Sequence, residues 1–387
     1  MEYSATKAFL VIKTNVMNRI NTFAGCLLVA LVLLVYACDS SDDGNGTSPT
    51  PEFDQAGMLE NYADNLIIPG YNDLQADANA LKSAADVFTA DPTTANLENL
   101  QNSLKSVRQS WQQVNFYQFG PAETSILRSV LNTYPTDTDK VDQNIENGGY
   151  TLGSVDNIAA GGFPAIDYLV NGLGDSNDEI VVSFTLDIQA ENRKTYLTDN
   201  ANFVKSNIDL VTDSWQSSGG DYRGTFLDAT NAGTGVGSST SLLVNAMIQH
   251  YERYLRDGKI GIPAGVRSAG VPRPMATEAF YGGYSAELLV ANLQAFRDLF
   301  TGANGSGLDD NLIFLDSEAL ASDIRSGLDQ AITEAQALTD PLSGNIENNN
   351  DQVIEVFTSL QEVMVLIKVD MTSALGITIN FQDNDGD

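Results

Sequence analysis

One stretch near the middle of the chain places a carboxylate where it could do chemistry. Residues 161–172 read Gly-Gly-Phe-Pro-Ala-Ile-Asp-Tyr-Leu-Val-Asn-Gly. The two glycines remove the steric limits of a Cβ atom, and Pro164 suits the first turn of a helix, where its missing N–H is no loss. The stretch therefore predicts that Asp167 sits at the start of a short helix, under backbone that a ligand can approach closely. The alternative is a glycine-proline turn in which Asp167 only caps its own helix.

The histidine content limits the chemistry further. His250 is the single histidine of the chain, so a zinc site with two histidines is excluded, and any serine–histidine relay would have to use this residue. It shares a helical stripe with Leu243 and Met247. This position favours a hydrogen-bonded core histidine over a catalytic one.

A third group of candidate residues follows later in the chain. Glu278, Tyr281 and Ser285 are spaced three and four residues apart, so on a helix they would share one face. A solvated face is the plain interpretation of such a trio. The glycines at 282 and 283 make room beside Tyr281, which favours a pocket there.

Charge and missing motifs exclude several classes of function. The chain has 51 acidic and 20 basic residues and a net charge of −31, which argues against nucleic acid as a partner and suits cations or cationic ligands. It contains no Gly-x-Ser-x-Gly elbow, no P-loop and no zincin motif. Cys26 and Cys38 are the only cysteines. Both belong to the N-terminal signal or anchor, so we expect neither a cysteine nucleophile nor a disulfide.

The spacing of apolar residues predicts an all-α protein from Phe53 onward. No window of the sequence combines strict alternation with hairpin signals, as strands would. Apolar residues instead recur every three or four positions, in stripes from Leu74 to Ala85, Leu97 to Val114, Leu197 to Trp215, Leu243 to Tyr254, Leu289 to Phe300 and Leu320 to Ile332.

A last helix is predicted from Val353 to Ala374. Its segment from Val363 to Val369 is apolar on nearly every side, which is typical of a helix in the centre of a fold. Lys368 and Asp370 would then need partners or a wet cavity, because a buried unpaired charge is costly. A structural ion pair and a role in a site fit these two charges equally well.

The first 38 residues have the order of a lipoprotein signal. Basic residues precede an apolar run from Phe23 to Val35, which is short for a membrane span and typical of a secretion signal. The sequence Val-Tyr-Ala-Cys at 35–38 resembles a lipobox. We therefore expect residues 1–37 to be removed and Cys38 to be lipidated, with an uncleaved apolar anchor as the alternative. Residues 38–52 would form a disordered acidic tether. The acidic cluster directly after Cys38 resembles the surface-export signal of Bacteroidetes-type lipoproteins, with a plain solvated spacer as the alternative.

Several stretches together resemble the imelysin family of bacterial envelope lipoproteins, which are nominally classed as peptidases. Residues 162–167, Gly-Phe-Pro-Ala-Ile-Asp, are similar to the family's Gly-x-His-x-x-Glu motif. Further similar stretches lie at 67–71, 119–123, 259–267, 278–285 and 368–376. The chain departs from the family at the motif itself, where Pro164 stands for the histidine and Asp167 for the glutamate.

The resemblance implies two packed helical bundles with the motif at their junction. We expect them at residues 53–172 and 173–387, separated by the loop that begins at Gly172. A tryptophan-bearing helix late in each half hints at an internal duplication. The polar positions of the family-like stretches are the ligand-binding candidates, namely Gly162, Asp167, Glu123, Arg267, Glu278, Tyr281 and Asp370.

Three functions compete on these grounds. The resemblance implies a ligand- or metal-binding lipoprotein of the cell envelope, anchored in the outer membrane on either face and serving iron or another nutrient. An active peptidase or hydrolase is the second function, and a structural or adhesive surface protein is the third. Because Pro164 has no ligand atom, we expect no protease turnover and weak binding of zinc and ferrous iron.

The ligand itself stays open between two classes. Calcium or magnesium could be held by Asp167 with Glu123 or Glu278, since hard cations accept sites made of oxygen alone. An organic ligand, such as an acidic oligosaccharide, could instead meet Arg267, Tyr281 and the glycine backbone.

The signal analysis generates the first prediction. In Cys38→Ser the acyl chains have no attachment site, so the protein should move from the membrane fraction to the soluble fraction. The measurement is fractionation of expressing cells followed by immunoblotting, with Cys26→Ser as a control that should stay with membranes. If Cys38→Ser fractionates like wild type, the lipoprotein interpretation fails.

Overall fold

The computed structural model describes residues 52–381, and each regular element in this range is a helix. The predicted all-α class is therefore confirmed. The signal peptide, Cys38 and nearly all of the tether lie outside the described residues. Between residues 52 and 381, no helix has both the length and the apolar character required to cross a membrane.

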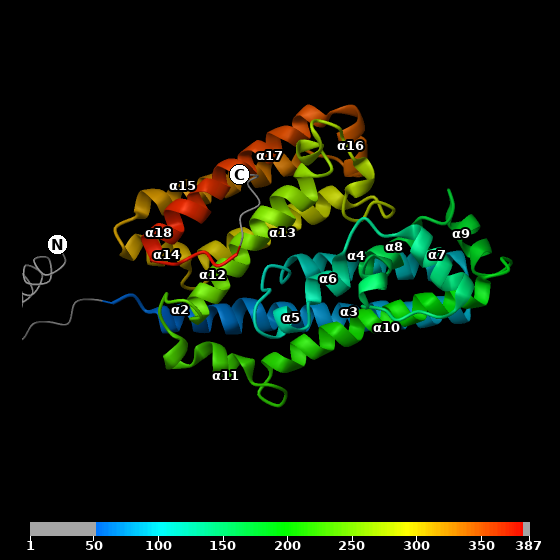
Figure 1. Cartoon of the computed structure of the whole chain (residues 1–387), viewed down its shortest axis with the longest axis horizontal. Helices are drawn as coiled ribbons and strands as arrows, with labels where there is room; N and C mark the ends of the chain where they lie inside the picture. The colour runs from blue at the N-terminus through cyan, green and yellow to red at the C-terminus, as the bar shows by residue number, and fades with distance from the viewer. Residues whose placement is uncertain (1–51, 382–387) are drawn as a thin grey trace, which may run out of the picture. The chain divides into compact units, whose positions relative to one another are not determined.

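The first bundle is built along α3 (Ile68–Ala90), with α4 (Thr94–Gln112) and α10 (Ala190–Trp215) packed lengthwise against it (Figure 1). The predicted apolar stripes of these three helices are buried between them. Shorter helices complete the bundle: α2 (Gln55–Asn61), η1 (Tyr62–Ile67), α5 (Pro121–Thr124), α6 (Leu127–Asn132), α7 (Thr138–Asn147), η2 (Val155–Ala160), α8 (Gly162–Asn171) and α9 (Asn177–Ser183).

The second bundle contains the remaining long helices. In it α13 (Ser285–Thr301) packs on α15 (Glu318–Gln336), which packs on α17 (Asn350–Val365). The segment α11 (Tyr222–Leu227) and η3 (Ala229–Asn231) leads into it. Its other elements are α12 (Ser239–His250), η4 (Tyr251–Gly261), η5 (Val266–Ser268), η6 (Pro274–Ala276), α14 (Leu308–Phe314), α16 (Leu342–Asn348), η7 (Leu366–Met371) and α18 (Thr372–Leu375).

The chain passes from the first bundle to the second after α10, and not at the expected boundary near Gly172. Although α9 and α10 follow this glycine, α9 packs on α4 and α8, and α10 packs on α3. The glycine-rich loop is thus a turn within the first bundle. Trp111 and Trp215 lie on α4 and α10, so both tryptophans belong to one bundle and do not mark two repeated halves.

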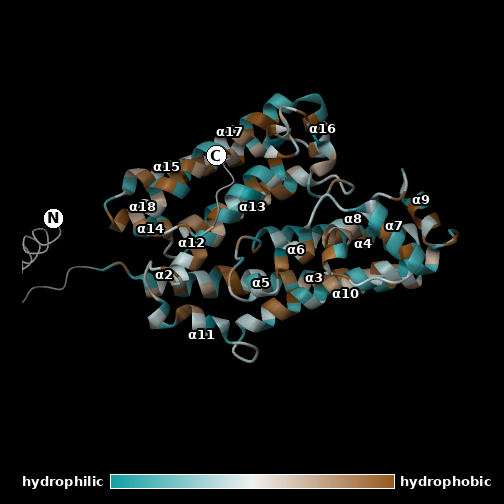
Figure 2. Cartoon of the chain, viewed as in Figure 1, coloured by the Kyte–Doolittle hydropathy of each residue, from teal (hydrophilic) through white to brown (hydrophobic). Residues whose placement is uncertain are grey.

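The two bundles share a core. One cluster of buried apolar residues extends through both of them, and Figure 2 shows brown and teal residues side by side along the long helices, as amphipathic helices require. Close to the contact of α4 with α13, the ring of Phe116, in the turn after α4, meets that of Phe296 edge to face with centroids 6.3 Å apart. The Tyr62 hydroxyl donates across the junction to the Leu299 carbonyl at 2.8 Å.

The last helix is not central, contrary to the expectation from its apolar sequence. Val365 and Val369 are 48% and 58% exposed, while Val363 and Ile367 are buried, so α17 and η7 bury one face only. Single exposed apolar residues are common on folded proteins. An apolar sequence on every side of a helix therefore does not require the helix to be buried on every side. Lys368 finds its partner in Glu252, with 3.1 Å between Nζ and Oε2.

Gly162 opens α8 and fixes how closely this helix packs. Its φ is +73°, in the region that side chains rarely adopt. A Cβ atom here would lie 2.4 Å from the Leu131 carbonyl oxygen and 2.7 Å from that of Val130. The glycine therefore serves the packing of α8 against the end of α6, whereas the sequence suggested an open backbone for a ligand.

This packing generates the second prediction. Gly162→Ala should lower the free energy of unfolding by about 2 kcal/mol or more, because the left-handed backbone and the contact with α6 both become unfavourable. Gly148 is a matched control, with φ +68° and no atom within 4 Å of a new Cβ. Gly148→Ala should cost only about 1 kcal/mol, the backbone contribution alone. Urea unfolding of both variants checks this; equal losses would show that the close approach at Gly162 is unimportant.

Candidate functional site

Asp167 lies at the junction of the bundles and is 1% exposed. It does not cap its own helix. Its carboxylate accepts hydrogen bonds from the Asn171 side chain at 3.0 Å and from the backbone N–H of Tyr281 at 3.2 Å. Burial raises the pKa of Asp167, against the opposing effects of Arg108 and of these hydrogen bonds. Asp167 thus binds α8 to the loop that precedes α13.

Arg108 lies between two buried carboxylates. Its Nη1 is 3.8 Å from Asp167 Oδ2 and its Nη2 is 3.9 Å from Glu278 Oε1, and the side chain is 0% exposed. Among the described residues none of its three guanidinium nitrogens has a hydrogen-bond partner, and neither has the Tyr284 hydroxyl. The ring of Tyr284 lies 5.8 Å from the guanidinium. Arg108 is thus held by charge and by an aromatic face, without direct hydrogen bonds.

Glu278 is the most heavily bonded acid of the site. It forms a buried ion pair with Lys259, and it accepts hydrogen bonds from Asn132 at 2.8 Å and from Gln112 at 3.2 Å. Burial acts to raise the pKa of Glu278, but Lys259 and Arg108 outweigh it and hold the pKa below its ordinary value. Glu278 therefore stays ionised at neutral pH and ties α4, α6 and η4 together.

The π-helical segment η4 positions the residues that come from the second bundle. The Ile262 N–H bonds back five residues to the Asp257 carbonyl at 2.7 Å. In such a helix residues five apart lie on the same side, which lets Tyr254 and Lys259 both reach the junction. Widened helices of this kind occur frequently at functional sites.

His250 is buried, as its apolar stripe predicted, and both ring nitrogens are occupied. Nε2 is 2.8 Å from Asn292 Oδ1, and Nδ1 is 3.2 Å from Arg128 Nη2. The Asn292 amide group donates to the Gln112 carbonyl and to Asn115, so its Oδ1 must accept from His250. Burial, followed by Arg128, lowers the pKa of His250 well below 6.5. His250 is therefore a neutral imidazole that positions Arg128.

Arg128, on α6, lies against an aromatic ring of the second bundle. Its guanidinium lies 3.8 Å from the centre of the Tyr254 ring and donates to the Asn115 carbonyl at 2.6 Å. Burial lowers the pKa of Arg128 to about 10, against the effect of Tyr254. Arg128 therefore remains charged at neutral pH.

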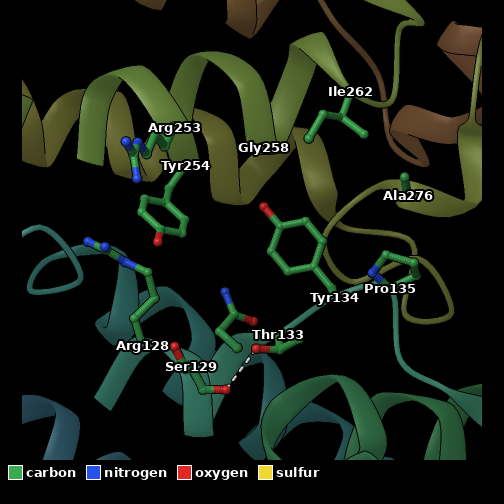
Figure 3. A pocket seen from close by; sticks show the side chains of 11 residues that line it. Arg128, Ser129, Thr133, Tyr134, Pro135, Arg253, Tyr254, Gly258, Ile262 and Ala276 are labelled. Carbon is green, nitrogen blue, oxygen red and sulfur yellow. Dashed lines mark hydrogen bonds between the residues drawn. The ribbon is translucent and has the colours of Figure 1, made fainter. Parts of the chain in front are cut away.

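A pocket of about 250 Å³ opens beside Arg128, between α6 of the first bundle and η4 of the second (Figure 3). Tyr134 and Tyr254 face one another across it. A cavity of about 20 Å³, enough for a single water molecule, shares the lining residues Arg128, Asn132, Tyr134 and Tyr254 and also touches Lys259 and His250. The pocket and the small cavity therefore share one wall.

The structure brings together some of the candidates from the sequence and separates others. Asp167, Glu278 and Tyr281 meet at the junction, with Gly162 behind them in α8. Three candidates lie elsewhere. Glu123 and Asp370 are exposed, and Arg267 pairs with Asp257 at 3.0 Å.

The expected helical face of Glu278, Tyr281 and Ser285 is wrong. Residues 277–284 form a turn, and α13 begins only at Ser285. Ala279, with φ +53°, keeps this stretch out of a helix. Tyr281 packs instead on Tyr168, with ring centroids 5.3 Å apart.

Sequence reasoning missed the residues that dominate the site. They are Arg108, Gln112, Arg128, Asn132, Tyr134, Tyr254 and Lys259. A signal existed for the first of them, because Arg108 follows Leu104 by four residues and so interrupts the buried stripe of α4. Nothing in the short helix α6 indicated that Arg128 would line a pocket.

The site does not offer a ready position for a metal ion. Within residues 52–381, no three histidine, cysteine, aspartate or glutamate side chains gather closely enough to hold one. Asp167 and Glu278 flank Arg108, so the guanidinium occupies the place that a cation between them would take. The proposed pairing of Asp167 with Glu123 is not formed, because Glu123 lies at the surface.

The third prediction concerns the pH dependence of stability. The unfolded chain takes up a proton on His250 near pH 6.5, whereas the folded chain resists it. The contribution of neutral His250 to the free energy of unfolding is therefore complete above pH 6.5. It is lost as the pH falls below this value, at a rate approaching about 1.4 kcal/mol per pH unit.

The check compares wild type with His250→Gln, whose amide can still donate to Asn292. Urea unfolding between pH 7 and pH 5 should show a smaller loss of stability in the variant. Parallel curves for the two proteins would contradict a buried neutral histidine.

A family model and one curated protein match the chain. The model of the imelysin family (peptidase M75) matches residues 67–364 of the 387. The iron-regulated protein A of Synechococcus elongatus is 29% identical over 79 residues, which are 20% of this chain and 22% of that protein. The chain thus matches about a fifth of the length of this curated relative.

Two crystal structures are similar in fold. One is described as an iron-regulated protein A precursor from Parabacteroides distasonis, with a TM-score of 0.68, 17% identity, and coverage of 85% of this chain and 97% of the other. The second is an imelysin-like protein from Psychrobacter arcticum, with a TM-score of 0.61, 16% identity, and coverage of 84% and 97%.

Proposed function

Because the chain belongs to the imelysin family, we propose that it is an iron-linked binding protein of the cell envelope, which holds a small ligand in the pocket at the bundle junction. The observation that carries this proposal is the polar cluster under the pocket. Both bundles contribute to it, through Arg128 and Tyr134 on one side and Tyr254 and Lys259 on the other.

A contribution to stability does not readily explain the buried charged cluster at the junction. Buried ion pairs are weak contributors to stability, because the loss of hydration offsets their attraction. In the described part of the chain, the guanidinium of Arg108 even lies beyond hydrogen-bond distance of both carboxylates that neutralise it. Groups of this kind, with shifted pKa values beside a pocket, are typical of functional sites.

The iron link comes from the relatives. The curated protein from Synechococcus elongatus and the similar structure from Parabacteroides distasonis both carry the name iron-regulated protein A. A binding role suits this site better than peptide hydrolysis, because His250 uses both ring nitrogens within the core and Pro164 offers no ligand atom. The envelope location rests on the lipobox-like sequence at Cys38.

The fourth prediction tests both the pocket and the iron link. Ala276 lines the pocket, and its neighbour Met275 is 61% exposed outside the lining. Ala276→Phe should fill the pocket, whereas Met275→Phe places the same aromatic side chain at the neighbouring position outside the lining. The full chain is equilibrated by dialysis against radioactive iron, supplied as ferric citrate, as ferric nitrilotriacetate and as a ferrous salt.

We expect wild type and Met275→Phe to retain about one iron per chain from at least one of these forms. Ala276→Phe should lose at least nine-tenths of this retention. The proposal is overturned if wild type retains no iron in any form, or if Ala276→Phe retains as much as Met275→Phe.

A further inference from the structure

The geometry points to a small polycarboxylate as the ligand of the junction pocket, bound through one of its carboxylates to Arg128. This inference rests on the proposed function for the place of the site, and it adds the chemical class of the ligand. It is carried by the charges that line the pocket, by the bonding of Arg128 and by the nature of the surrounding walls.

The lining of the pocket contains basic residues, although the chain as a whole is strongly acidic. Acidic residues outnumber basic ones by 51 to 20 in the sequence. Neither the outer pocket nor the inner cavity has an aspartate or glutamate in its lining, whereas Arg128 and Arg253 line the first. Lys259 lines the second, but Glu278 already neutralises it. An anion entering from the acidic surface would therefore meet a favourable charge at Arg128.

Arg128 is the residue best placed to receive this anion. In the described part of the chain it forms no ion pair with a carboxylate, and its Nε has no hydrogen-bond partner. The Asn115 carbonyl and His250 Nδ1 engage Nη2, and Tyr254 covers one face of the guanidinium. The orientation of the side chain is thus fixed. Because Nε is buried, the donors that can meet a carboxylate are those of Nη1.

The other walls indicate a carbon skeleton and not a bare inorganic anion. Pro135, Ile262 and Ala276 give the pocket an apolar side, and the phenol ring of Tyr134 stands opposite Tyr254 (Figure 3). Phosphate would leave this side unfilled. The volume of about 250 Å³ is below the range of about 300–1,000 Å³ typical of drug-sized ligands, so the ligand is small.

A polycarboxylate also explains how iron could be carried without protein ligands. Ferric iron is a hard cation that takes oxygen donors, and carboxylates of a small molecule supply them. One carboxylate would bind Arg128 while the others hold the metal. The same site would accept the free acid, so the experiment must separate the acid from its chelate.

The test measures binding of citrate to the full chain by calorimetry in iron-free buffer, and then binding of ferric citrate. Arg128→Gln keeps a planar amide but removes the charge, and the control Arg273→Gln removes an exposed arginine outside the pocket. We expect wild type and the control to bind citrate, and Arg128→Gln to bind it at least tenfold more weakly. Phosphate and the neutral trimethyl citrate should bind at least tenfold more weakly than citrate to wild type.

A second pair of variants covers the case in which Arg128→Gln does not fold. Ile262 lies at the rim of the pocket and is 37% exposed, and Ile313 on α14 is 39% exposed. Ile262→Glu places a negative charge beside the ligand and should weaken citrate binding at least fivefold. Ile313→Glu makes the same change away from the pocket and should leave citrate binding as in wild type.

The outcomes separate this inference from the proposed function. Absence of citrate binding, equal binding of phosphate, or equal weakening by Ile262→Glu and Ile313→Glu overturns the inference. If iron is still retained in the pocket in that case, the proposed function stands without it. If citrate binds through Arg128 but no form of iron is retained, the ligand class is supported and the iron link fails.

Discussion

The structure depends on the burial of one guanidinium. Arg108 has no contact with solvent, and a charge in such a place must be compensated by neighbouring charges. Asp167 on α8 and Glu278 on the loop before α13 supply this compensation from two directions. Asp167 belongs to the first bundle, as Arg108 does, whereas Glu278 belongs to the second. The need to neutralise Arg108 therefore acts together with the shared apolar core in setting how the two bundles pack.

The family motif has a different role in this chain from the one that its sequence suggests. Gly162 allows α8 to approach α6, and Asp167 directs its carboxylate at Arg108 and at the backbone of Tyr281. Both residues thus have a structural role in the packing of α8. The groups that face the pocket come from other elements, chiefly Arg128 and Tyr254. The motif therefore holds the framework, while the residues that line the pocket come from other elements.

The fold could be predicted from sequence largely because it depends on periodic burial. The stripes of α3, α4, α10 and α13 repeat every three or four residues, and their members are buried. The site could be predicted only in part, since Asp167 and Glu278 lie in recognisable stretches but their partners do not. The turn at 277–284 depends on tertiary contacts, and the π-helical register of η4 extends over the whole of Tyr251–Gly261. Neither leaves a periodic trace in the sequence.

The two tryptophans give the molecule a spectroscopic reporter of its own. Trp111 lines the small inner cavity beside Arg128 and Lys259. Trp215 is enclosed by Phe119, Tyr222 and Phe226 at a separate position in the first bundle. A change inside this cavity would alter the surroundings of the first indole and leave those of the second as they were. Tryptophan emission therefore responds to the inner cavity through one indole alone, and no dye or label is required.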